Sequence, residues 1–354
     1  PRPAGTGQMV PPRPMPATGG TGPMGAPMQG GPQRTGTGSL IPGPAANPQR
    51  PGFPGSRPGG PATGGLRPGR PITGAHFLYA FGTPGFNPGE FQQPRGMTMD
   101  ANKLLYVADT ENSRVQVFDA QGNFQREIKP AAGRESFRFP RSVAISPTNG
   151  RIYIVDELDF RIYVFDGDGK QVSVWDRRRN ASDPSAIPGR LAISPNGNIY
   201  ISEPNSHRVQ MYSSTHAFTA AFGANGELQS PSGLAVGPKA MLYVLDYGQC
   251  RVHQYDNKGK PGQPFGRRGA GPGEFSVPRD VAIDRSGYVF VADTLNHRIQ
   301  IFSPTGDPLA VLGQKGKGEG QFAGPEGLAL SQDDLLFVSD RGNGRIQVFQ
   351  IDRG

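Results

Sequence analysis

The sequence predicts an all-β fold: a six-bladed β-propeller preceded by an extended tail rich in proline and glycine. Three observations lead to this prediction. A block of strand-forming residues that ends in an acid occurs six times, at nearly constant spacing. Each repeat unit is long enough for four short strands separated by turn residues. The first 74 residues lack the apolar content that a packed core needs.

The tail is defined by its composition. Residues 1–74 contain 18 prolines and 19 glycines, which is half of the segment. Such a chain cannot bury enough apolar surface to offset the conformational entropy that folding would remove. From His76 onward, β-branched and aromatic runs alternate with turn residues. We therefore place the domain boundary near residue 75, with a low-complexity tail at 1–74 and a propeller at 75–354.

The positive charge of the chain lies almost entirely in the tail. The tail has seven arginines and no lysine, aspartate or glutamate, so it carries +7 of the formal net charge of +8. The remaining 280 residues contain 30 basic and 29 acidic side chains. This distribution indicates a role for the tail in self-association or in binding a protein partner. A linker without a partner is the alternative.

The start of the chain and its cysteine content bear on the compartment. The chain starts at Pro1 without a methionine, which favours an extracytoplasmic protein whose leader has been removed. The single cysteine, Cys250, excludes an internal disulfide framework but does not decide the compartment. No apolar run approaches the roughly 18 residues that a membrane span needs, so we expect no span.

The repeated block predicts the blades of the propeller. Its six acids lie 47, 47, 43, 47 and 47 residues apart, and an arginine follows each acid five positions later. An active site occurs once, whereas a structural bond is repeated in every blade, so we expect ion pairs or turn hydrogen bonds between the second and third strands. The pairs are Asp109 and Arg114, Asp156 and Arg161, Glu203 and Arg208, Asp246 and Arg251, Asp293 and Arg298, and Asp340 and Arg345.

An aromatic residue stands three positions before each acid. Side chains alternate between the two faces of a strand, so these aromatics lie opposite the flanking aliphatic residues. A sheet sandwiched between two neighbouring blades requires this arrangement, and we expect the aromatics to pack between blades. They are Tyr106, Tyr153, Tyr200, Tyr243, Phe290 and Phe337.

The ring is predicted to close between the two ends of the domain. The sixth repeat stops after its third strand, near Ile351. The segment His76–Gly82 resembles the fourth-strand segments of other repeats, such as Pro308–Gly313. We therefore expect Phe77–Phe81 to form the outer strand of the last blade, which removes an exposed sheet edge.

A proline opens each repeat, at a corner that lies at the mouth of the channel in a propeller. Arginines follow this proline in four repeats, and Glu326 is the only acid in the corresponding positions. Converging guanidinium groups predict a site for an anionic partner, such as a phosphate backbone or an acidic peptide. Solvated loop arginines are the alternative. The predicted ligand-binding residues are Arg95, Arg141, Arg190 and Arg279.

The segment Asp293-Thr294-Leu295-Asn296-His297-Arg298-Ile299-Gln300-Ile301-Phe302 resembles the NHL signature, and Glu203–Met211 is close to it. The chain thus resembles the NHL-repeat β-propellers, including the NHL domains of tripartite-motif proteins and bacterial NHL-repeat proteins. The resemblance implies the propeller fold. For function it implies several unrelated roles, among them RNA binding on the arginine-bearing face, which would place the protein in the cytoplasm.

One enzymatic branch of this family, the peptidyl-hydroxyglycine amidating lyases, holds zinc with histidines in the channel. The segments that we expect to line the channel contain no histidine, which argues against a lyase. They are Gly96–Asp100, Ser142–Ser146, Arg190–Ser194, Gly233–Gly237, Asp280–Asp284 and Gly327–Ser331.

No motif in the chain indicates a cofactor. The run Asp166-Gly167-Asp168-Gly169 could bind calcium, but it is more typical of a hairpin turn. The run Arg177-Arg178-Arg179 and the sequon Asn180-Ala181-Ser182 are both consistent with a polar loop. We expect no metal, no cofactor and no catalytic residue.

The sequence therefore favours a non-enzymatic propeller that acts as a binding or assembly scaffold, with the tail contacting neighbouring subunits or a partner. An RNA-binding domain of the tripartite-motif type is the first alternative. An enzyme like the amidating lyases is the second.

Overall fold

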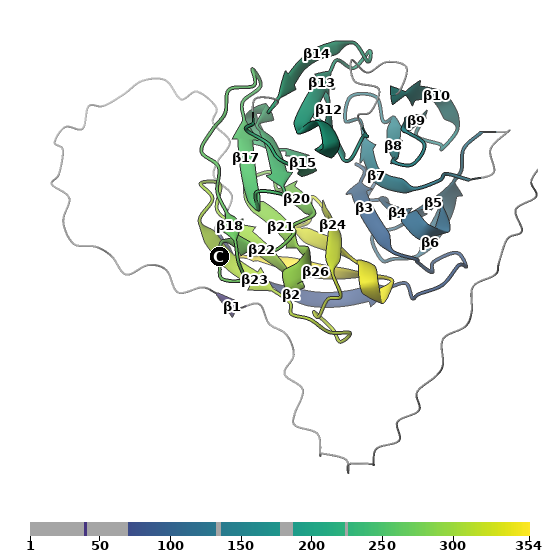
Figure 1. The fold of residues 1–354 in the computed structure, drawn as a ribbon. Coiled ribbons are helices and arrows are strands. Elements are labelled where there is room, and N and C mark those ends of the chain that lie inside the picture. Colours follow the sequence, from purple (N-terminus) through teal and green to yellow (C-terminus); the bar gives the residue numbers. More distant parts are fainter. Residues whose placement is uncertain (1–38, 41–69, 132–135, 178–186, 224–225) are drawn as a thin grey trace, which may run out of the picture. The chain divides into compact units, whose positions relative to one another are not determined.

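The computed structural model describes residues 39–40, 70–131, 136–177, 187–223 and 226–354. All of them belong to one compact unit, Thr35–Gly354. Most of the tail, Arg178, Arg179 and the sequon at 180–182 lie outside these residues. The described residues form six small antiparallel sheets, one for each predicted repeat (Figure 1). The all-β prediction and the six-bladed propeller are confirmed.

The first three blades each have four strands. Blade 1 comprises β3 (Pro94–Met99), β4 (Leu105–Asp109), β5 (Arg114–Phe118) and β6 (Phe124–Ile128). Blade 2 comprises β7 (Pro140–Ile145), β8 (Ile152–Asp156), β9 (Arg161–Phe165) and β10 (Gln171–Asp176). Blade 3 comprises β11 (Leu191–Ile193), β12 (Ile199–Glu203), β13 (Arg208–Tyr212) and β14 (Phe218–Phe222).

The other three blades differ at their outer edges. Blade 4 comprises β15 (Pro231–Val236), β16 (Leu242–Asp246) and β17 (Arg251–Tyr255). Blade 5 comprises β20 (Asp280–Ile283), β21 (Val289–Asp293), β22 (Arg298–Phe302), β23 (Pro308–Leu312) and the short β1 (Ser39–Leu40). Blade 6 comprises β24 (Pro325–Leu330), β25 (Leu335–Asp340), β26 (Arg345–Arg353) and β2 (Ile72–Phe81).

Short elements complete the turns. A parallel pair, β18 (Arg267–Arg268) and β19 (Glu274–Phe275), lies in the connection from blade 4 to blade 5. The 3-10 turns are η1 (Thr110–Asn112), η2 (Pro204–Ser206), η3 (Pro238–Ala240), η4 (Thr294–Asn296) and η5 (Arg341–Asn343). In the part of the chain that the structure describes, no helix has the length and apolar character needed to cross a membrane.

The hydrophobic core is divided among the interfaces between blades. On β4, Tyr106 packs with Val143 and Ile152 of blade 2. Leu105 and Val107 point the opposite way and pack with Ile346 of blade 6. The other five predicted aromatics lie in clusters with the next blade in the same manner. Strand alternation therefore gives every blade two buried faces, and the clusters join the blades into a ring.

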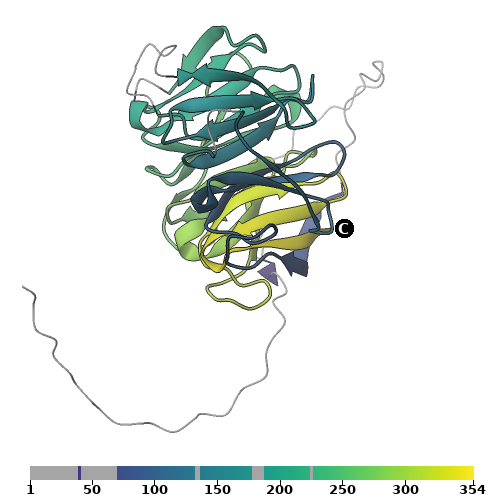
Figure 2. The same cartoon turned by 90° about the vertical axis from the view of Figure 1, so that its right-hand side faces the viewer.

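The ring closes as predicted. β2 pairs antiparallel with β26, with Phe77 opposite Phe349 and Phe81 opposite Ile346. The purple β2 accordingly lies beside the yellow strands of blade 6 (Figure 1, Figure 2). The strand begins at Ile72, and both Ile72 and Ala75 are buried in the core between blades 5 and 6. Residues near the end of the predicted tail thus contribute to the core.

Blade 4 departs from the four-strand prediction. Among the described residues its sheet has three strands, and only isolated bridges follow along β17, from Val252 to Phe265 and from Tyr255 to Pro261. The outer segment contains Pro261 and Pro264. Proline has no backbone N–H to donate to a neighbouring strand, so a continuous fourth strand does not form.

The closure leads to a prediction about truncation. A chain beginning at residue 70 retains β2 and should unfold cooperatively. A chain beginning at residue 85 loses β2, exposes the edge of β26 and removes Phe77 from its contact with Phe349. We expect a loss of at least about 3 kcal/mol in the free energy of unfolding, measured by urea denaturation. Equal stability of the two chains would contradict closure through β2.

Candidate binding site at the mouth of the channel

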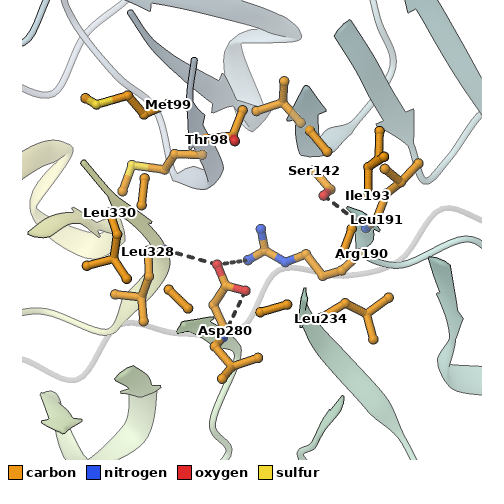
Figure 3. A pocket seen from close by; sticks show the side chains of 18 of the residues that line it. Thr98, Met99, Ser142, Arg190, Leu191, Ile193, Leu234, Asp280, Leu328 and Leu330 are labelled. Atoms are coloured by element: carbon orange, nitrogen blue, oxygen red, sulfur yellow. Dashed lines mark hydrogen bonds and ion pairs between the residues drawn. The ribbon is translucent and has the colours of Figure 1, made fainter. Parts of the chain in front are cut away.

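The channel is lined by the first strand of each blade, as the sequence predicts. A cavity of about 230 Å³ lies between these strands, and most of the residues around it have apolar side chains, including Met99, Ile193 and Leu330. Arg190 and Asp280 are the two charged residues of its lining. They point toward each other from blades 3 and 5 across the centre of the view in Figure 3.

Arg190 and Asp280 form a buried ionic bridge in the channel. Arg190 Nη2 lies 3.7 Å from Asp280 Oδ2 and makes no hydrogen bond with any described residue. The carboxylate of Asp280 also accepts hydrogen bonds from the backbone N–H groups of Val281 and Leu328, at 3.0 Å each. Burial raises the pKa of Asp280, and Arg190 opposes this rise. The bridge therefore places Arg190 inside the channel, where its Nη1 also donates to the backbone carbonyl of Arg141 at 3.4 Å.

Glu326 holds a second arginine of the predicted site. Arg95 Nη1 donates to both carboxylate oxygens of Glu326, at 3.0 and 3.2 Å, and Arg341 Nη1 lies 3.4 Å from Oε2. Burial alone would raise the pKa of Glu326, but the guanidinium groups of Arg95 and Arg190 help to hold it below its ordinary value. Glu326 is thus ionised and neutralises the arginines around it.

The remaining two arginines line a small pocket. Arg141 Nη1 donates to Glu157 Oε2 at 2.6 Å, and Glu157 raises the pKa of Arg141 against the opposing effect of burial. Arg279 lies over the ring of Tyr247, 4.7 Å from its centroid. No carboxylate among the described residues lies within ion-pair distance of Arg279. The pocket has a volume of about 210 Å³. It is lined by Arg141, Glu157, Ile187, Gly189, Pro204, Asn205, Ser232, Tyr247 and Arg279.

Arg279 is therefore the residue of the predicted site that keeps an open guanidinium. Burial lowers the pKa of Arg279 from the ordinary arginine value; the negative charge of Glu326 opposes this change, and the positive charge of Arg141 adds to it. Arg95, Arg141 and Arg190 each face an acid, namely Glu326, Glu157 and Asp280. The sequence did not reveal which acids the ring brings opposite these three arginines, and a ligand-binding role for the four residues stays a prediction.

The repeated acids form a second set of buried groups. In blade 1, Asp109 Oδ2 accepts from Arg114 Nε at 2.8 Å, from Asn112 at 2.8 Å and from Gln116 at 3.0 Å. Asp109 Oδ1 accepts from the backbone N–H of Gln92, which precedes the blade. Burial raises the pKa of Asp109, while Asn112 and Arg114 lower it. The carboxylate therefore connects the second strand, the turn, the third strand and the incoming loop.

All six predicted acid and arginine positions are direct partners between the second and third strands. The corresponding bonds occur at 2.7 Å in Glu203–Arg208, 2.8 Å in Asp293–Arg298 and 2.9 Å in Asp340–Arg345. No such bond is recorded for the other two pairs within the described residues. Arg161 instead lies 3.0 Å from Asp159, and Arg251 is exposed. The two exceptions are Asp156–Arg161 and Asp246–Arg251, whose backbones remain paired.

Sequence reasoning missed the amide side chains of this network. Blades 1, 5 and 6 share the spacing Asp-x-x-Asn-x-Arg-x-Gln, and in each the asparagine and glutamine donate to the acid. The recurring spacing was the available signal. The amide residues are Asn112 and Gln116, Asn296 and Gln300, and Asn343 and Gln347.

Blade 3 uses a different donor. Arg177 is 1% exposed, and its Nη2 donates to Glu203 at 2.7 Å and to Gln210 at 2.6 Å. Its guanidinium also packs over the rings of Trp175 and Tyr212. In blade 3, Arg177 thus donates to Glu203. In blade 1, the equivalent acid, Asp109, accepts from a backbone N–H instead. The polar-loop interpretation of this residue is wrong, because it belongs to the core of blade 3.

The candidate metal sequence forms a turn. Asp166 Oδ1 accepts from the backbone N–H groups of Asp168 and Lys170, at 3.1 and 2.9 Å, between β9 and β10. The described residues contain no group of three His, Cys, Asp or Glu side chains that could hold a metal ion.

Three segments of the chain match the model of the NHL repeat family, at residues 91–118, 275–302 and 322–349. These are the blades with the full Asp, Asn, Arg and Gln set. Each matched segment begins and ends with a phenylalanine, and the two rings pack together with centroids 5.4, 5.6 and 5.8 Å apart. The first and last residues of each matched segment are therefore in contact in the folded blade.

Curated relatives cover parts of the propeller. The Drosophila melanogaster protein brain tumor is 26% identical over 187 residues, which is 52% of this chain but only 14% of that protein. A probable peptidyl-alpha-hydroxyglycine alpha-amidating lyase of Caenorhabditis elegans is 31% identical over 160 residues, 43% of each chain. Among solved structures, a gluconolactonase from Xanthomonas campestris has a TM-score of 0.58 at 16% identity, covering 81% of this chain and 99% of that one. This last likeness concerns the fold alone.

The role of Arg177 leads to a prediction about stability. Replacing it by methionine leaves part of the buried Glu203 carboxylate without its donor. We expect Arg177→Met to lower the free energy of unfolding by about 3–5 kcal/mol. Arg161→Met is the matched control, because the side chain of Arg161 is 36% exposed, and its loss should cost under about 1 kcal/mol. Similar losses in the two variants, measured by urea denaturation, would refute the core role of Arg177.

Proposed function

Because this chain is an NHL-repeat β-propeller, we propose that it is a non-enzymatic scaffold that binds an acidic partner at the channel mouth and assembles through its basic tail. The observation that carries the first part is the environment of Arg279. It lies in a pocket beside Arg141, and Tyr247 supports its guanidinium from one side. A carboxylate of the partner would supply the ion-pair partner that Arg279 lacks among the described residues.

The size and charge of the pocket favour a single acidic side chain as the group that enters it. A volume of about 210 Å³ is small, and Arg141 and Arg279 outnumber Glu157 in its lining. A planar guanidinium can hold a carboxylate with two parallel hydrogen bonds. The tail contributes separately, because its seven arginines have no acid beside them in residues 1–74.

RNA is the second candidate for the mouth, since a phosphate group would also accept from Arg279. Phosphate contacts dominate the affinity of proteins for nucleic acids. The propeller, with 30 basic and 29 acidic side chains, offers little general attraction for a polyanion. The balance therefore favours an acidic protein segment.

An amidating lyase is the third candidate, and its support is the similarity to the Caenorhabditis elegans protein. Against it stand the first strands of the blades, which contain no histidine to ligate zinc. Incubation with a peptidyl-α-hydroxyglycine should therefore give no cleavage above background. Cleavage that increases in proportion to the protein concentration would replace the scaffold proposal by an enzymatic one.

The mouth proposal predicts a binding defect without a folding defect. Arg279→Met keeps an unbranched apolar side chain and removes the charged guanidinium that lies over Tyr247. We expect it to weaken binding of a peptide rich in aspartate and glutamate by about 10- to 100-fold, the worth of a charge-assisted hydrogen bond. Fluorescence anisotropy with this peptide, and in parallel with uridine-rich RNA, measures the effect.

The control for this variant is Arg285→Met, at the opposite end of β20, where the side chain is 69% exposed. It should bind as the unmodified chain does, and both variants should retain its melting temperature. If Arg279→Met binds the peptide as tightly as the unmodified chain does, Arg279 is a solvated loop arginine and does not bind the partner. A defect confined to RNA would favour the nucleic-acid candidate.

The tail proposal predicts salt-sensitive association. We expect the whole chain to sediment as an oligomer at low ionic strength and to dissociate at about 1 M salt, because screening weakens contacts between the tail arginines and acids of a neighbour. A chain of residues 70–354 should be monomeric under both conditions. Analytical ultracentrifugation compares the two chains. Monomers throughout would show that the tail does not mediate assembly.

A further inference from the structure

The outer edge of blade 5 carries a fifth strand that comes from the tail. β1 pairs antiparallel with β23, with Ser39 opposite Val311 and Leu40 opposite Ala310 (Figure 1). We infer that this edge is the site at which the tail of one copy joins the next: Ser39–Leu40 of one chain pairs with Pro308–Leu312 of a second copy. The inference rests on the proposed tail-mediated assembly and assigns it a docking strand.

The sequence of β23 suits the addition of a strand. Its residues are Pro308, Leu309, Ala310, Val311 and Leu312, without a charged side chain. Natural sheets protect exposed edges with charges, and the outer strand β6 contains the charged residues Arg126 and Glu127. β10 ends in an aspartate. An apolar edge that lacks such protection readily accepts an extended segment through main-chain hydrogen bonds.

The outer edge of β23 is less exposed than that of β14, as expected for an edge that is paired with β1. At equivalent positions, opposite the glutamines of the third strands, Val311 is half-buried and Ala221 of β14 is exposed. β14 is also free of charge, but its sheet has no fifth strand among the described residues. The edge of blade 5 is therefore distinguished by the strand added to it.

The connection to the propeller is long enough to serve a neighbouring copy. Residues 41–71 separate β1 from β2, which gives 31 residues. At roughly 3.3 Å per residue, such a connection spans at most about 100 Å. A compact domain of this size has a diameter of about 50 Å. The same strand can therefore reach the edge of its own blade 5 or that of a second molecule.

Exchange between copies uses the same hydrogen bonds as the contact within one chain. The two arrangements differ mainly in local concentration, which for a flexible connection is on the order of 1 mM. Near this concentration a neighbour competes with the chain's own tail. The tail and the edge are different surfaces, so the resulting contact is head-to-tail and extends into a filament when its rotation does not close.

Cysteine cross-linking between two distinguishable chains tests the exchange. One chain carries Ser39→Cys and the other, with a mass tag, carries Val311→Cys. Directly paired strand residues have Cα separations that a disulfide can bridge. The native Cys250 is fully buried and serves as the background. Mixed at about 1 mM under mild oxidation, the chains should give at least 10-fold more heterodimer than Ser39→Cys mixed with Ala221→Cys.

A double variant, Ser39→Cys with Val311→Cys in one chain, measures the contact within a molecule. An internal cross-link without any heterodimer would overturn the exchange between copies, and the absence of both would overturn the strand pairing itself. Equal heterodimer with the Ala221→Cys control would also overturn the site. If the heterodimer or both cross-links are absent but the whole chain still associates in sedimentation, the proposed assembly through the tail stands. The tail then docks at a different site.

A charge at the edge provides a test that does not depend on disulfides. Val311→Lys should reduce association of the whole chain at least 10-fold in sedimentation, because a lysine protects an exposed edge. Ala221→Lys, at the equivalent position of β14, should leave association unchanged. Equal association of the two variants with the same melting temperature would overturn the assignment to blade 5.

Discussion

The buried carboxylate at the end of each second strand is the interaction on which the ring depends. Asp109 receives donors from the turn, the third strand and the loop that arrives from the preceding blade. Arg114 extends the same network, since its Nη2 donates to the backbone carbonyls of Asn87 and Glu90 in that loop. A single buried carboxyl group therefore fixes the fold within a blade and the path between two blades. Its burial is tolerated because its oxygens are supplied with donors.

The exceptions to the repeat indicate where the molecule is specialised. Blade 3 replaces a backbone donor by Arg177, and blade 4 lacks a regular outer strand in the described residues. Around the channel, three of four arginines are paired with acids, and Arg279 keeps an open guanidinium. The pairing limits the positive charge that these three arginines offer to a ligand. The proposed binding site therefore rests on a position that breaks the symmetry of the ring.

The inner strands of the blades and the closure of the ring could be predicted from the sequence, because both follow from repeated local patterns, whereas the outer edges of blades 4 and 5 could not. The likeness of His76–Gly82 to other fourth strands identified β2 correctly. The acids that pair with the channel arginines could not be predicted from repeated local patterns. Arg190 and Asp280 lie 90 positions apart and meet only because the ring brings blades 3 and 5 across from each other. The burial of Arg177 was hidden for a similar reason, since its partners Glu203 and Tyr212 belong to strands of the following repeat.

The closure also determines how the protein would carry mechanical load. β2 continues directly into the tail, and it is held along its length by pairing with β26 from Ile72 to Phe81. A pull on the tail in the direction of the strand acts on these hydrogen bonds together and not one after another. The tail is thus attached to the ring by a strand pair that such a pull loads in shear. Ile72, at the start of this strand, is also buried in the core between blades 5 and 6. A filament built through the tail would transmit tension into the most tightly closed part of each propeller.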